Sequence, residues 1–222
     1  MRIGIIAEGK GDLAVIENVI KGITGFDSSN FFHLRPSDDL DETDLGRGDP
    51  TRSTWSLVKK ECVEKKAIER FLKLEDNKYI VIHLDTDRAQ DYEIEIPERN
   101  DIFCENLREK VIIKIKEWLG NEYLEKMLFA IAIEEIDAWL LTIHGNLKDT
   151  SLSPNPKKAL SFSLAKKRVD TTSNYYNFLS LSKPFSKDKE VKKGKFLELN
   201  CSLRLFHEEV QKMWAKENLL IN

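Results

Sequence analysis

Acidic residues follow three apolar segments of this chain, and carboxylates grouped in this way could bind a divalent metal. In chain order they are Glu8 and Asp12 after residues 2–7, Asp85 and Asp87 after residues 79–84, and Glu134, Glu135 and Asp137 after residues 127–133. Carboxylates that converge in a partly dry site repel one another, so a cation is their natural partner. Mg²⁺ binds a few carboxylates and leaves positions for phosphates, and two such ions could clamp a phosphodiester.

These acids converge only if the three apolar segments are neighbouring parallel strands. Each segment is a continuous apolar run, which is typical of a strand buried on both faces. Leu13, Ile16 and Ile20 follow the first run at helical spacing. The alternation of strands and helices predicts an α/β fold, a Rossmann-like parallel sheet flanked by helices. Sites in such sheets form beyond the carboxyl ends of the strands.

The remaining elements divide the chain into two parts. Further helices are expected over residues 53–74, 101–119, 137–144 and 199–215, with a short strand at 31–34 and a long loop at 35–54. We expect residues 1–150 to form the metal-binding α/β domain. Residues 151–222 then form a basic, mainly helical C-terminal extension.

The extension carries a basic segment that could bind nucleic acid. Lys and Arg outnumber Asp and Glu over residues 157–195, although the formal net charge of the chain is −3. The basic residues with which we expect nucleic acid to bind are Lys157, Lys158, Lys166, Lys167 and Arg168. Tyr175, Tyr176 and Phe178 could stack on unpaired bases. A solvated segment without a ligand explains the same composition equally well.

Several of these motifs resemble those of TOPRIM domains. Glu8-Gly9-Lys10-Gly11-Asp12 resembles the ExxxD entry motif, and Asp85-Thr86-Asp87 resembles the DxD motif. Residues 135–141 resemble the E-x-(E/D)-A-W-x-L stretch of an uncharacterised TOPRIM-like family related to RloB-like and OLD-type proteins. The stretches at residues 155–160 and 202–206 are similar to later parts of that family.

The resemblance implies a TOPRIM fold, a Mg²⁺ or Mn²⁺ cofactor and cleavage of phosphodiester bonds, often in phage defence beside a separate ATPase protein. It implies that Glu8 is a ligand or a general acid or base, and that Asp12, Asp85 and Asp87 are metal ligands. Glu8 and Asp85 are then the catalytic residues. Glu135 and Asp137 would complete a second metal position, although the family more often has Glu where this chain has Asp137.

Each motif also has an ordinary structural explanation. Asp12 could cap the first helix, the DxD acids could be loop acids, and Glu134 and Glu135 could be first-turn acids favoured by the helix dipole. Lys10 and Gly11 do not form a P-loop, because the GxxxxGK(S/T) pattern is absent, and no GxGxxG follows the first strand. His83 is expected to be a buried histidine bonded to backbone, with a site role as the alternative.

These observations favour a divalent-metal-dependent nuclease that acts on DNA or RNA. The alternatives are a non-catalytic partner subunit of a defence ATPase complex and a small-molecule phosphotransferase or phosphatase. A homo-oligomer is compatible with all three. The three cysteines show no CxxC spacing, so we expect reduced, inert thiols and no zinc site. The chain shows no signal peptide and no apolar run of about 20 residues that could span a membrane, so we expect a cytoplasmic protein without a membrane partner.

Overall fold

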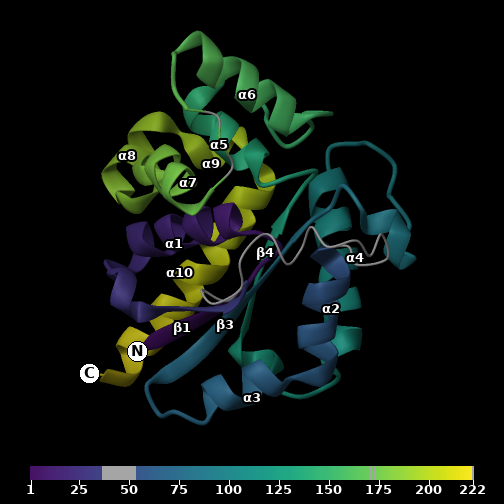
Figure 1. Cartoon of the computed structure of the whole chain (residues 1–222), viewed down its shortest axis with the longest axis vertical. Coiled ribbons are helices and arrows are strands. Elements are labelled where there is room, and N and C mark those ends of the chain that lie inside the picture. The colour runs from purple at the N-terminus through teal and green to yellow at the C-terminus, as the bar shows by residue number, and fades with distance from the viewer. Residues whose placement is uncertain (37–53, 171, 173, 222) are drawn as a thin grey trace.

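The computed structural model of the chain describes residues 1–36, 54–170, 172 and 174–221 (Figure 1). The predicted loop over residues 35–54 therefore lies almost entirely outside the described residues. Among the helices that are described, none is long and apolar enough to cross a membrane.

A four-stranded parallel sheet forms the centre of the molecule, as the sequence predicts. Its strands are β1 (Arg2–Ile6), β2 (Phe31–Arg35), β3 (Asn77–Asp85) and β4 (Met127–Ala132), in the spatial order β2-β1-β3-β4. The chain moves outward from β1 to β2 on one side and then continues from β3 to β4 on the other. The sheet thus has a topological switch point between β1 and β3, where open α/β sheets bind their ligands.

Strand register brings the ends of β1 and β3 together. Ile6 pairs with Ile82, so the chain beyond β1 continues beside the last residues of β3. Asp85 in turn pairs with Ala132 of β4. The acids that follow these three strands therefore emerge at one edge of the sheet.

Helices cover both faces of the sheet (Figure 1). On one face, α1 (Lys10–Thr24) and α10 (Cys201–Ile221) pack on residues such as Ile5 and Val81. On the other, α2 (Thr54–Glu64), α3 (Lys66–Leu72) and α4 (Phe103–Leu119) pack on Ile80 and Ile82. This alternation follows from the two-residue period of a strand.

The C-terminal region packs along the length of α1, where Asn18 donates to Leu179 and Ser182 and Gly22 lies against Phe185. Its helices are α5 (Asp137–His144), α6 (Pro156–Lys166), α7 (Tyr175–Leu181), α8 (Asp188–Gly194) and α9 (Phe196–Leu199), with the 3₁₀ turn η5 (Lys183–Ser186) between α7 and α8. Three further 3₁₀ turns, η1 (Ser28–Asn30), η3 (Ala89–Tyr92) and η4 (Leu124–Lys126), lie in the α/β part of the chain. Phe178, Leu181 and Phe185 from this region belong to the same apolar core as α1. Helix α7 and turn η5 therefore pack directly on α1.

Several helix boundaries differ from the sequence-based expectation, including that of α4, which begins at Phe103 and not at residue 101. The helix expected over residues 53–74 is two helices, because Lys65 adopts a left-handed backbone conformation with φ 56°. The first helix begins at Lys10 with Gly9 as its N-cap, so Asp12, the cap that the sequence suggested, lies inside the first turn. The last helix starts two residues later than predicted and continues to Ile221.

Candidate metal centre

Glu8 lies at the switch point, held by groups from two other elements. One carboxylate oxygen accepts a 2.6 Å hydrogen bond from the amide of Asp85, and the other accepts a 2.5 Å bond from the hydroxyl of Thr54 at the start of α2. The side chain of Arg35 donates to the carbonyl oxygens of Ala7 and Glu8, at 2.7 and 3.1 Å. The turn after β1 is thus fixed, and only 8% of the Glu8 surface is exposed.

Asp85, the last residue of β3, points toward the third acidic segment. Its Oδ1 accepts a 2.8 Å hydrogen bond from the amide of Ile136, which directly precedes α5. The indole of Trp55 donates to its backbone carbonyl at 2.9 Å. Asp85 is therefore bound to the segments after β1 and after β4, and the side chain is 18% exposed.

His83 is the residue around which these acids converge. Its side chain is fully buried, with Nδ1 3.7 Å from Asp12 Oδ2 and Nε2 3.4 Å from Asp85 Oδ1. Neither ring nitrogen makes a hydrogen bond to any residue that the structure describes. The expectation of a histidine bonded to backbone is therefore wrong. Oxygen and nitrogen atoms of Glu8, His83 and Asp85 lie within 4.8 Å of one another, as in a set of metal ligands.

Asp12 combines the two roles that the sequence left open. Its Oδ2 accepts a 2.8 Å hydrogen bond from the amide of Gly9, so it caps the first turn of α1. The same oxygen faces His83. Burial, partly offset by His83 and reinforced by Asp85 and Glu8, raises the pKa of Asp12 to about 7. Asp12 therefore caps α1 and also belongs to the acidic group.

The pKa values of the other acids are also raised. Burial, together with Glu8 and Asp87, raises the pKa of Asp85 well above its ordinary value. Burial also raises the pKa of Glu8, although His83 and the hydrogen bond from Thr54 oppose the shift. These carboxyls hold protons more tightly than free carboxyls do. A bound divalent cation would favour their charged forms instead.

The remaining predicted ligands lie in an adjoining cleft of about 530 Å³. Asp87, Glu135 and Asp137 line it, together with Glu134. Burial and the neighbouring Glu135 raise the pKa of Asp87 and bring that of Asp137 to about 6. Among the described residues these acids do not form a set of three ligand atoms within 4.8 Å. The structure therefore divides the predicted ligands into two groups. Glu8, Asp12 and Asp85 surround His83, whereas Asp87, Glu135 and Asp137 line the cleft.

The cleft wall is tied to the end of β3 by Glu134. This residue has a left-handed backbone conformation, with φ 62°. Its amide donates a 2.8 Å hydrogen bond to the hydroxyl of Thr86, and its carbonyl accepts a 3.1 Å bond from the amide of Asp87. Arg99 forms an ion pair with its carboxylate at 2.5 Å. A strained backbone held by several partners is common at functional sites.

Basic residues line this cleft beside the acids, but not all the predicted ones do. Lys157 and Lys158, at the start of α6, line the cleft, and the amide of Lys157 donates to Glu135 at 3.3 Å. Lys166 and Lys167 lie at the other end of α6, about 15 Å away at 1.5 Å per residue. Lys167 donates to the carbonyl of His144 at 2.8 Å, and neither Lys167 nor Arg168 lines the cleft.

The aromatic residues beside this segment are mostly not free to stack on bases. Phe178 is 5% exposed and belongs to the core, although its edge reaches the cleft. The hydroxyl of Tyr175 donates a 2.9 Å hydrogen bond to Glu17. Tyr176 is 81% exposed. Of the three candidates for base stacking, Tyr176 alone has a free face.

Sequence reasoning missed two residues of the site, Arg35 and Thr54, and gave a site role for His83 only as the alternative. His83 shares a strand face with Asp85, and that two-residue spacing is the signal that marks it. No local motif marks Thr54 or Arg35, because each acts on Glu8 from a different element.

The chain matches no protein-family model, no curated protein and no solved structure. A function for the chain therefore has to be argued from the residues of the site.

Proposed function

We propose that the chain is a divalent-metal-dependent nuclease with a TOPRIM-like site, using Mg²⁺ or Mn²⁺. The observation that supports this best is the convergence of Glu8, Asp12 and Asp85 on a buried histidine without a hydrogen-bond partner among the described residues. Carboxylate oxygens suit Mg²⁺ and Mn²⁺, and an added imidazole nitrogen favours a transition metal. The donor set therefore fits either ion, and Mn²⁺ better than Mg²⁺.

Glu8, Asp85 and His83 would hold the ion, and Asp12 would orient His83 from the opposite side. A metal in this position supplies charge to stabilise the phosphodiester during its displacement. The chain itself holds the metal ligands in place. Thr54 and the Asp85 amide fix the Glu8 carboxylate, and the Ile136 amide fixes that of Asp85. Prearranged ligands of this kind need little reorganisation when the substrate reacts.

The cleft beside the site suits a polyanionic substrate. Lys157 and Lys158 would attract phosphates, and Asp87, Glu135 and Asp137 line the same cleft. Without metal, these acids would repel a phosphate. A bound metal would offset that repulsion. We further propose that Glu135 and Asp137 contribute to a second metal position only when substrate phosphate completes the ligand set. We place the protein in phage defence, beside an ATPase partner, on the TOPRIM resemblance alone.

Cleavage of supercoiled plasmid DNA and of structured RNA, each with Mg²⁺ or Mn²⁺, tests the proposal. Wild type should cut at least one substrate, faster with Mn²⁺, and Glu8→Ala and Asp85→Ala should lower the rate by about a hundredfold or more. Asp91→Ala is the matched control, because Asp91 is an exposed acid paired with Arg88. A wild type that cuts neither substrate, or variants that cut equally well, would contradict the catalytic role. Hydrolysis of a small phosphate ester without nucleic-acid cleavage would favour the phosphatase instead.

A further inference from the structure

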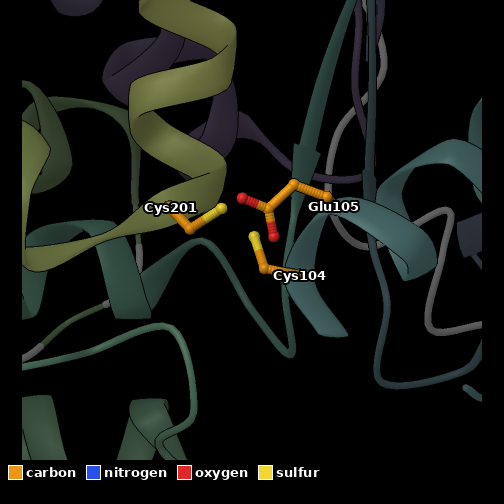
Figure 2. Close-up of side chains that lie close together, drawn as sticks. All are labelled: Cys104, Glu105 and Cys201. Atoms are coloured by element: carbon orange, nitrogen blue, oxygen red, sulfur yellow. The ribbon is translucent and has the colours of Figure 1, made fainter. Parts of the chain in front are cut away.

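Two of the three cysteines lie together at the starts of two helices. Cys104 is the second residue of α4 and Cys201 is the first residue of α10, so 97 positions of the chain separate them. Glu105 follows Cys104 directly. Figure 2 shows the two sulfur atoms and the carboxylate turned toward one another. One ligand atom from each of the three side chains lies within 4.8 Å of the other two.

The surroundings leave this group partly without partners. Glu105 Oε2 is buried and accepts no hydrogen bond from the described residues. Cys104 is 6% exposed, whereas Cys201 is only partly buried, so an ion could enter from the Cys201 side. A buried carboxylate oxygen without a partner costs free energy that a bound cation would recover.

Arg204 supplies a compensating charge at the edge of the group. Its guanidinium lies 3.3 Å from Glu105 Oε1 and 3.7 Å from Cys201 Sγ. With both thiols deprotonated by a bound ion, the two thiolates and one carboxylate would carry three negative charges. Arg204 also pairs with Glu208 at 3.1 Å, so its charge is shared with an acid outside the group. A divalent cation would offset the negative charge that remains.

We propose that Cys104, Cys201 and Glu105 form a binding site for a thiophilic divalent cation, with Zn²⁺ as its best occupant. Zinc is bound by thiolate sulfur at about 2.3 Å and by carboxylate oxygen at about 2.0 Å. The ligand atoms need to move only slightly inward from their present spacing. Three protein ligands leave the fourth tetrahedral position for water or an exogenous group.

This site is chemically distinct from the acidic centre at the switch point. The acidic centre offers carboxylates and one imidazole, which suit hard ions, whereas thiolates select soft ones. A bound zinc ion would also link α4, on one face of the sheet, to α10, on the other. Binding should therefore stabilise the contact between these helices.

Cobalt and zinc binding to the reduced full-length chain tests the proposal. Co²⁺ should give a sulfur-to-cobalt charge-transfer band in wild type, and Zn²⁺ should abolish that band at one equivalent and raise the Tm. Cys104→Ser and Cys201→Ser should lose the band. Glu105→Gln should weaken Zn²⁺ affinity by at least about tenfold, since even outer partners of metal ligands have such effects. An acidic-centre variant, Asp85→Asn, should keep the band.

Cys62→Ala is the matched control, because this third thiol is buried in α2 outside the group. The Cys62→Ala variant should bind Co²⁺ and Zn²⁺ as wild type does. A wild type without the band, or serine variants that retain Zn²⁺ affinity, would overturn the proposal. So would a reduced chain that takes up no Zn²⁺ and instead closes a Cys104–Cys201 disulfide with glutathione disulfide.

Discussion

The amide of Asp85 donates a 2.6 Å hydrogen bond to the carboxylate of Glu8, and this bond joins the ends of β1 and β3 across the switch point of the sheet. It places two carboxylates side by side in a buried site. Glu8 therefore raises the cost of ionising Asp85. Stability and metal binding should consequently oppose each other at these positions.

Asp85→Asn should separate the two effects. The amide oxygen of Asn can still accept the hydrogen bond from Ile136, while the charge that repels Glu8 is gone. We expect the metal-free variant to be more stable than wild type by about 1 kcal/mol, as is common when a strained functional group is neutralised. Urea unfolding measures this. Addition of Mn²⁺ should raise the Tm of wild type but not of the variant.

The exposed Asp91→Asn provides the control, since it removes one acid that is paired with Arg88 at the surface. Its stability should stay within about 0.5 kcal/mol of wild type, and its response to Mn²⁺ should be unchanged. A destabilised Asp85→Asn would show instead that the carboxylate charge holds the fold together.

Metal affinity should depend on pH near neutrality. Burial raises the pKa of Asp12 to about 7 and that of Asp137 to about 6. Below these values a proton occupies each carboxyl, and a metal must displace it. The apparent Mn²⁺ affinity should therefore fall as the pH is lowered from 8 to 6, by up to about tenfold per unit for each proton displaced. Calorimetric titrations with Mn²⁺ at pH 8, 7 and 6 measure this change in affinity.

The stability of the metal-free protein should change in the opposite direction. A carboxyl whose pKa is higher in the folded chain than in the unfolded chain binds its proton more tightly when folded. Asp12 thus contributes stability that is fully present below its ordinary value of 3.8 and is lost as the pH rises through about 7. Asp12→Asn should remove this part of the pH dependence. An unchanged profile in that variant would assign the effect to other groups.

The fold could be predicted from the sequence because its strongest signals are local. The apolar run ending at Asp85 is long enough to specify a strand buried on both faces, and the glycines around Lys10 mark the turn after β1. The break at Lys65 was not predictable, because a lysine in a left-handed conformation carries no signal in the sequence. The helical pattern on either side of it reads as one helix.

The candidate site was predictable only in part, since its members come from different elements. The acids after three strands were visible because parallel strands end at one edge. The pairing of Cys104 with Cys201 depends on how α10 packs beside α4, which no spacing in the chain encodes. Similarly, Lys158 and Lys166 belong to one basic segment in the sequence, but α6 carries them to opposite ends.

This separation along α6 gives a prediction for nucleic-acid binding. Replacing Lys157 and Lys158 by Ala should weaken binding to DNA or RNA and reduce the slope of log K against log salt by about 1 for each phosphate contact removed. Replacing Lys166 and Lys167 by Ala should leave both quantities near wild type. Fluorescence anisotropy over a salt series measures the two double variants. Equal losses in both would indicate a diffuse basic surface instead of the cleft.

The contact between α1 and the C-terminal region depends on Gly22. A Cβ atom at this position would lie 2.1 Å from the backbone carbonyl oxygen of Phe185, which cannot move without shifting η5. Gly→Ala inside a helix ordinarily adds about 1 kcal/mol of stability. Here overpacking should reverse the sign, so Gly22→Ala should cost about 1–3 kcal/mol in urea unfolding. Because α1 carries Asp12 at its start, the variant should also bind Mn²⁺ more weakly. An ordinary gain in stability would mean that η5 does not rest on α1 as described.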